Sequence, residues 1–130
     1  ARYSAFEARR RAGAATASIT RDEIETRGVV NAWQMLRTVS AVDLIEGPEG
    51  VVPISRRVPT MDLRGNRPCY MRVAIDGVLL AESPVNLSQR MPPVPDIHGI
   101  EVFAGPASIP SEYAGDQRDM VCGLIVVWTR

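Results

Sequence analysis

"CGLIVVWT" (Cys122–Thr129) is the stretch of sequence that decides the fold. Its residues from Leu124 to Trp128 are all apolar, without the alternation of a strand that keeps one face in water. A continuous apolar run of this length is typical of a strand in the middle of a sheet covered on both faces. The sequence therefore predicts a central strand here, with other elements packed on both of its sides.

Two other segments supply neighbouring strands. "CYMRVAIDGVLL" (Cys69–Leu80) alternates between two faces, with Cys69, Met71, Val73 and Ile75 on one and Tyr70, Arg72 and Ala74 on the other. Asp76-Gly77 then predicts a turn into a hairpin arm. A further strand is expected at Ile100–Phe103, after a proline-rich turn with one helical turn in residues 91–99. Residues 47–68 fit either a strand pair or an irregular connector.

Helices are predicted before these strands. Thr20 and Glu23 form a capping-box pattern, and Gly28 ends the first helix. A second helix is expected over Asn31–Val39, with an apolar face. The predicted fold class is α+β: a small central mixed β-sheet flanked by short helices. Residues 1–18 are expected to form a loosely held N-terminal arm, and residues 19–130 a domain.

Composition excludes several classes of protein. The chain has 130 residues, 45% of them hydrophobic, with formal net charge zero, so a general nucleic-acid footprint is not expected. All fifteen basic residues are arginine, which excludes lysine chemistry such as a Schiff base. No stretch has the length of a membrane-spanning helix. The cluster Arg9-Arg10-Arg11 fits a solvated arm or a partner contact.

The stretch "IEVFAGPASIPSEYAG" (Ile100–Gly115) is interpreted as scaffold. Gly105-Pro106 fits a strand stop, and Pro106 has no N–H to offer to a phosphate. His98 is the only histidine, and a surface or turn position fits it better than a catalytic base. Asp76 belongs to a turn signal and has no second carboxylate tied to it by spacing. We therefore predict a non-catalytic chain without a cofactor or a metal site.

The two cysteines, Cys69 and Cys122, lack the spacing and the matching histidines of a zinc site. They are either two buried thiols or one disulfide. A bridge between them would stabilise the folded state by about 4 kcal/mol in the chain-entropy model, because it closes a loop in the unfolded chain. The residues alone leave both alternatives open.

Five pieces of the sequence, in order, carry a family resemblance. They are Ile19-Thr20 with Ile24 and Met35–Arg37, then Arg64-Gly65, "VAIDGV" (Val73–Val78), "DIHGIEVFAGPAS" (Asp96–Ser108) and "CGLIVVWTR" (Cys122–Arg130). Together they make residues 19–130 similar to the plug domain of outer-membrane receptors that depend on the TonB protein. The motif residues that the resemblance singles out are Arg64, Gly65, Asp76, Gly77, Glu101, Gly105 and Pro106.

The resemblance implies a domain at the periplasm or outer membrane whose partner is a β-barrel or another cell-envelope protein. It implies gating, or ligand or protein binding, at the periplasmic side, and it favours a Cys69–Cys122 disulfide in an oxidising compartment. In one departure, Ala104 stands where the family pattern has an arginine that pairs with acids on the barrel wall. This departure fits the alternative of a free-standing periplasmic or extracellular module, which could self-associate by pairing its N-terminal arm with a neighbour's sheet edge.

Overall fold

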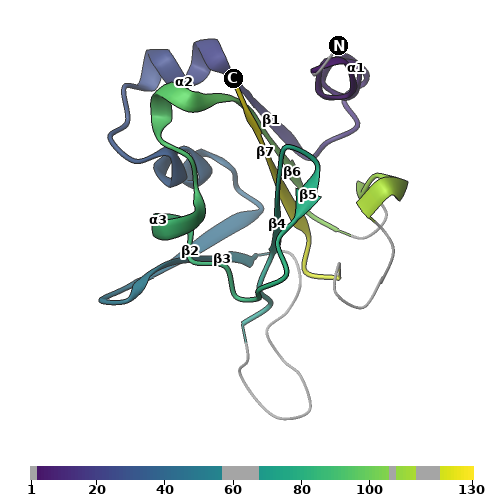
Figure 1. Cartoon of the computed structure of the whole chain (residues 1–130). Helices are drawn as coiled ribbons and strands as arrows, with labels where there is room; N and C mark the ends of the chain where they lie inside the picture. The colour runs from purple at the N-terminus through teal and green to yellow at the C-terminus, as the bar shows by residue number, and fades with distance from the viewer. Residues whose placement is uncertain (1–2, 57–67, 106–107, 114–120) are drawn as a thin grey trace.

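The structure is a computed structural model that describes residues 3–56, 68–105, 108–113 and 121–130 (Figure 1). Its centre is a five-stranded sheet with the order β1-β6-β7-β4-β5. These strands are β1 (Ala17–Thr20), β6 (Ile97–Phe103), β7 (Leu124–Thr129), β4 (Arg72–Ile75) and β5 (Val78–Leu79). The β4–β7 pair is parallel and the other three pairs are antiparallel. The predicted α+β class with a mixed sheet is confirmed.

Strand β7 lies in the middle of this sheet, as its apolar run predicts. Its side chains alternate between two apolar clusters. Ile125 and Val127 pack on one face with the main core. Leu124, Val126 and Trp128 pack on the other face with a second cluster. The lack of alternation in the sequence thus reflects two covered faces.

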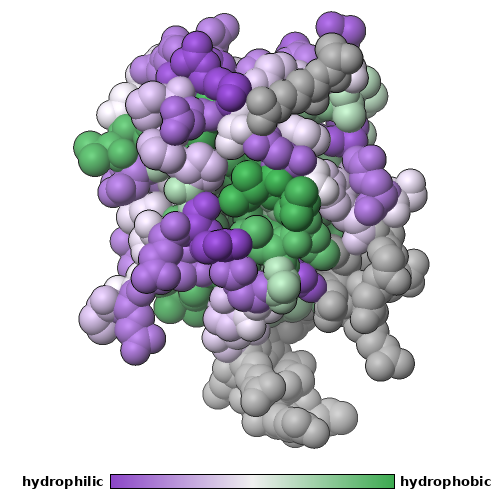
Figure 2. Space-filling model, viewed as in Figure 1, coloured by the Kyte–Doolittle hydropathy of each residue, from purple (hydrophilic) through white to green (hydrophobic). Residues whose placement is uncertain are grey.

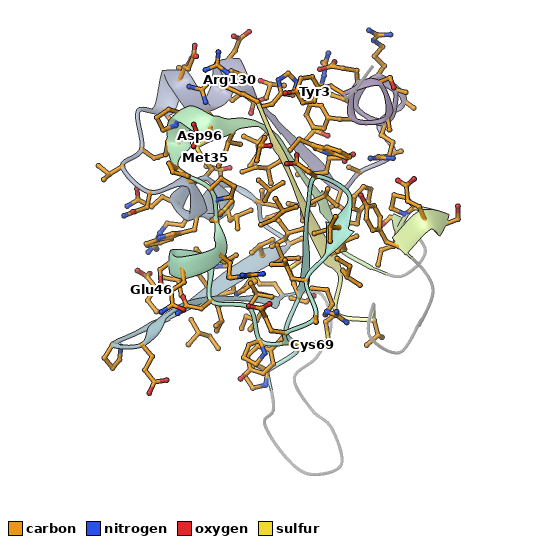
Figure 3. All side chains as sticks on the ribbon, viewed as in Figure 1. Tyr3, Met35, Glu46, Cys69, Asp96 and Arg130 are labelled. Atoms are coloured by element: carbon orange, nitrogen blue, oxygen red, sulfur yellow. A yellow bond between two sulfur atoms is a disulfide. The ribbon has the colours of Figure 1, made fainter. Side chains whose placement is uncertain are left out.

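The face with the main core is covered by short helices and a separate hairpin. These elements are α2 (Arg21–Arg27), η1 (Ala32–Thr38), β2 (Val42–Gly47), β3 (Gly50–Ser55), α3 (Leu87–Arg90) and η2 (Val94–Asp96). The Thr20 side chain accepts a hydrogen bond from the Glu23 N–H at 3.3 Å, and Gly28 ends α2 with φ +60°. The cap at Thr20 and the end of the helix at Gly28 are therefore confirmed. The second predicted helix is present as the 3-10 helix η1, which buries Met35 and Leu36; Figure 3 labels Met35 on this side of the sheet.

Two strand boundaries differ from the prediction. Strand β6 begins at Ile97, three residues before the predicted start, because the single turn η2 already ends at Asp96. The hairpin of β2 and β3 begins at Val42, in a segment for which no strand was predicted.

The β4–β5 turn at Asp76-Gly77 is confirmed, with φ +51° and +85°. Figure 2 shows an apolar area around the β4–β5 hairpin, where Val78 is 65% exposed.

The opposite face of the sheet carries α1 (Ser4–Ala12) and η4 (Ser111–Tyr113), at the right in Figure 1. The expectation of a loosely held arm is wrong for this segment, because α1 is a helix whose Phe6 is 1% exposed. Residues 17–20 form β1 and pair with β6. The division at residue 18 stays a prediction. None of the helices within the described residues has the length and apolar character needed to cross a bilayer.

Candidate functional site

The candidate site is the part of the sheet that lies beneath α1. Tyr3, Phe6 and Arg9 are spaced by three residues, so their side chains project from one side of the N-terminal turns. The Tyr3 hydroxyl donates a hydrogen bond to the Thr129 carbonyl oxygen at 2.7 Å. Its ring stacks on His98 with 3.7 Å between the centroids. Figure 3 shows Tyr3 at the end of the sheet where the chain reaches Arg130. This end of β7 is thus joined to the N-cap residue of α1.

Phe6 packs where the sheet has no side chain. A Cβ atom placed on Gly99 would come within 2.5 Å of the Phe6 Cζ atom. The ring also meets His98 edge-on at 5.7 Å between centroids. Gly99 therefore makes the space that allows the helix to approach β6 closely.

Arg9 forms the strongest polar link of this face. Its Nε and Nη2 atoms donate hydrogen bonds to the two carboxylate oxygens of Glu101 at 2.7 and 2.8 Å. The indole Nε1 of Trp128 donates to Glu101 Oε1 at 2.8 Å. The Glu101 side chain is 0% exposed, and a carboxylate buried to this degree is tolerated only when it is paired and hydrogen-bonded. The Nε–H and Nη2–H groups of Arg9 and the indole N–H of Trp128 meet that requirement for Glu101.

The surroundings of Arg9 stabilise its charged form. The hydrogen bond to Glu101 raises the pKa of Arg9, although its partial burial acts in the opposite direction. Its Nη1 atom also donates to Glu112 on η4 at 3.2 Å. The Arg9 Cζ atom lies 5.9 Å from the centroid of the Phe103 ring, within the range of a cation–π contact. Burial raises the pKa of the neighbouring Tyr113 hydroxyl.

His98 was predicted at a surface or turn position; it belongs to strand β6 and not to a turn, and its side chain is 26% exposed. It lies against the aromatic rings of Tyr3 and Phe6, and its Nε2 is 3.7 Å from Glu7 Oε1. All of these partners belong to α1 or its N-terminal cap. Among the residues that the structure describes, no group of three His, Cys, Asp or Glu side chains could hold a metal ion. The described contacts of His98 are those of a residue that seats a helix.

Asp76 ties the β4–β5 turn to the same end of β7. Its carboxylate accepts hydrogen bonds from the Thr129 N–H at 2.8 Å and from the Thr129 hydroxyl at 2.5 Å. Gly77 completes the turn with its positive φ. Asp76 and Glu101 therefore contact β7 at consecutive residues, Thr129 and Trp128.

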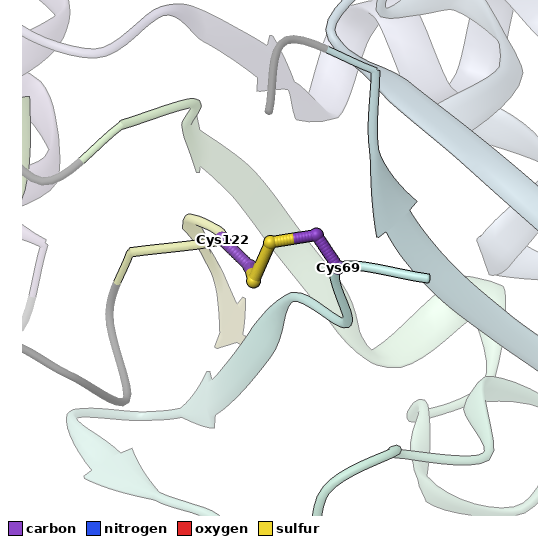
Figure 4. The surroundings of a disulfide bond; sticks show 2 residues. All are labelled: Cys69 and Cys122. Carbon is purple, nitrogen blue, oxygen red and sulfur yellow. A yellow bond between two sulfur atoms is a disulfide. The ribbon is translucent and has the colours of Figure 1, made fainter. Parts of the chain in front are cut away.

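The two cysteines form a disulfide, as the resemblance implied (Figure 4). Cys69 precedes β4 and Cys122 precedes β7, and these strands run parallel as neighbours. The bridge, with 5.2 Å between the Cα atoms, therefore joins the starting ends of two adjacent strands. It holds the parallel pair together where no short turn could connect it.

Three motif residues, Arg64, Gly65 and Pro106, lie outside the described residues. Gly105 follows Ala104 just after the end of β6, consistent with a strand stop. Glu101, Asp76 and Gly77 have the contacts given above. A joint role of all seven motif residues stays a prediction.

Comparisons with known proteins decide the family. The sequence model described as TonB-dependent Receptor Plug Domain matches residues 8–115. The chain belongs to this family. No curated protein matches the plug chain.

Among solved structures, this plug is similar to the siderophore receptor PirA from Pseudomonas aeruginosa, with a TM-score of 0.53 and 23% identity. The similarity covers 88% of the plug chain and 18% of the receptor chain. At this identity the likeness shows the fold alone. The plug therefore spans less than a fifth of the length of the receptor it resembles.

The contacts made by α1 are the part of the plug that sequence reasoning missed. Arg9 was interpreted as part of a solvated arm or partner contact, and the structure corrects this by placing it on the buried Glu101. The exposed Arg10 pairs with Glu7 of its own helix. The spacing of Tyr3, Phe6 and Arg9 was the available signal. It was obscured by the alanines and arginines that surround it.

Proposed function

We propose that this plug domain lies inside an outer-membrane β-barrel and closes its lumen from the periplasmic side until the receptor is opened through TonB. The observation that carries this proposal is the family match over residues 8–115. The structural likeness to a receptor, of which this chain corresponds to 18%, supports the view that a barrel is the partner. In this role the domain is a component of transport and not an enzyme.

The internal construction of the domain supports a closing role. A domain that blocks the lumen of a barrel must keep its folded shape while it is exposed to solvent and solutes. The central strand β7 is buried on both faces, and the Cys69–Cys122 bridge joins it to β4. A disulfide also persists in the oxidising periplasm, which is the compartment that such a domain would face.

For the alternative of a free-standing module for protein interaction or self-assembly, self-association finds no support in the described contacts. It required a free N-terminal segment that could pair with a neighbour's sheet edge. Residues 17–20 instead pair with β6 of the same chain, and α1 is docked on the same sheet. Ala104, which stands where the family pattern has an arginine, is buried and donates its N–H to the Thr16 hydroxyl at 2.9 Å. This position therefore serves the interior of the plug.

Channel recordings test the proposed function. The full-length protein would be purified from outer membranes with and without residues 1–130 and inserted into planar lipid bilayers. We expect a closed or weakly conducting protein when the plug is present and a large, steady conductance when it is deleted. Equal conductance of the two proteins, or a reading frame that encodes no barrel, would contradict the proposal.

A further inference from the structure

The groups that bind Arg9 all belong to elements other than α1. We call this set the guanidinium site: Glu101 and Phe103 on β6, Trp128 on β7 and Glu112 on η4. The Trp128 indole orients the Glu101 carboxylate from within the sheet. Phe103 offers a ring to the cation, and Glu112 offers a second carboxylate. Only the bound cation comes from α1.

The helix that carries this cation is held mainly by its docking. It has nine residues, and isolated helices shorter than about 12 to 15 residues are marginal in water. Its N-cap residue Tyr3 makes no side-chain cap hydrogen bond, and Phe6 is its only buried residue. Gly13, with φ +65°, ends it. The helical state of this segment therefore depends on the sheet face beneath it.

Simple departure of α1 would leave the Glu101 carboxylate without its cation. Removing one partner of a buried ion pair is strongly unfavourable. Exchange of one guanidinium for another leaves the pairing intact. The site should also discriminate against ammonium groups, because only a planar fork can match both carboxylate oxygens at once.

From these contacts we propose that the guanidinium site is a binding site for an arginine on a partner helix, and that α1 fills it as an intramolecular ligand. The bound pattern is an aromatic residue followed three positions later by arginine, as in Phe6 and Arg9. The aromatic ring occupies the space over Gly99, and the guanidinium pairs with Glu101. A partner segment with this pattern replaces α1 without baring the carboxylate. The proposal rests on this chain's own contacts and not on the proposed closing of a barrel.

Chemical rescue tests the site in the full chain. The Arg9→Ala variant should have a lower Tm than the native chain, and millimolar N-ethylguanidinium should raise it again. Ethylammonium at the same concentration should give a clearly smaller rise. The double variant Arg9→Ala/Glu101→Gln should respond to neither compound. Equal effects of the two cations, or an unchanged response in the double variant, would overturn the site.

Peptides test the exchange itself. Two capped peptides of residues 3–13, one native and one carrying Arg9→Ala, would be added to the isotope-labelled Arg9→Ala chain. The native peptide should shift the Trp128 indole N–H resonance and bind about tenfold or more tightly than the control, the difference expected for a charge-assisted pair. Absence of binding, or equal binding of both peptides, would overturn the proposal. If Arg9→Ala does not fold, Arg9→Lys serves as the host, with the same two outcomes.

Discussion

The two faces of the central sheet are covered in different ways. One face is covered by α2, η1, α3 and the β2–β3 hairpin, through an almost wholly apolar core. The other is covered by α1 and η4, with the Arg9–Glu101 pair set among apolar residues. Apolar burial stabilises any well-packed arrangement, whereas a buried charge accepts only a matched partner. The first face therefore contributes to stability through apolar packing, whereas the second also requires a matched charge from the helix that lies on it.

The largest effect should come from the apolar face. Leu36 is fully buried in the main core, so Leu36→Ala should lower the free energy of unfolding by about 3 to 5 kcal/mol through lost burial and a residual cavity. Denaturant unfolding followed by circular dichroism measures this. The matched control is Val30→Ala at an 84% exposed position, which should change stability by less than about 0.5 kcal/mol. Similar losses in both variants would contradict a core centred on this face.

Next comes the covalent link between β4 and β7. Replacing both Cys69 and Cys122 by serine should destabilise the domain by about 2 to 4 kcal/mol, because the unfolded chain regains the freedom of the closed loop. The shift in denaturation midpoint measures the change. Thiol titration of the native protein provides the check on the bond itself. Two titratable thiols without reductant would show that the bridge is absent.

A smaller and local effect is expected at Gly99. The Cβ atom of Gly99→Ala would collide with the Phe6 ring, so α1 should be displaced at a cost of about 1 to 3 kcal/mol. Gly47→Ala is the control, because nothing lies within 4 Å of its Cβ position. Loss of the Tyr3–His98 ring-current shifts in proton spectra would report the displacement. An unchanged α1 in Gly99→Ala would contradict close packing of Phe6.

The smallest effect concerns pH. The hydrogen bond with Arg10 lowers the pKa of Glu7, and the charges of His98 and Arg11 act in the same direction. A lowered carboxyl pKa stabilises the folded state above the unfolded pKa, and this contribution is lost as pH falls through the folded value. It should amount to a few tenths of a kcal/mol, since exposed helix pairs are worth about 0.2 to 0.5. Amide shifts of α1 between pH 7 and 3 should change in the native chain and much less in Glu7→Gln.

The apolar face could largely be predicted from sequence. The run at Leu124–Trp128, the cap at Thr20 and the turn at Asp76-Gly77 are local signals that agree with the final packing. The β2–β3 hairpin was only partly anticipated, because its first strand carries no clear alternation between buried and exposed residues.

The charged face could not be predicted in the same way. The bond between Arg9 and Glu101 joins residues 92 positions apart, and no local pattern specifies such a pair. The burial of a glutamate within a strand cannot be predicted from its own position, because it depends on a partner that is distant in the sequence. The Ala- and Arg-rich composition around Phe6 also favoured an exposed segment over a docked helix.

Native-state hydrogen exchange of the Arg9→Ala variant tests the separation of the two faces most directly. If α1 is held by its pairing with Glu101 while the apolar face holds the rest, amides of residues 7–12 should exchange at least about tenfold faster than in the native chain. Amides of β7 and α2 should keep their protection within a few-fold. A uniform loss of protection across α1, β7 and α2 would contradict the account, because it would show that both faces unfold as one unit.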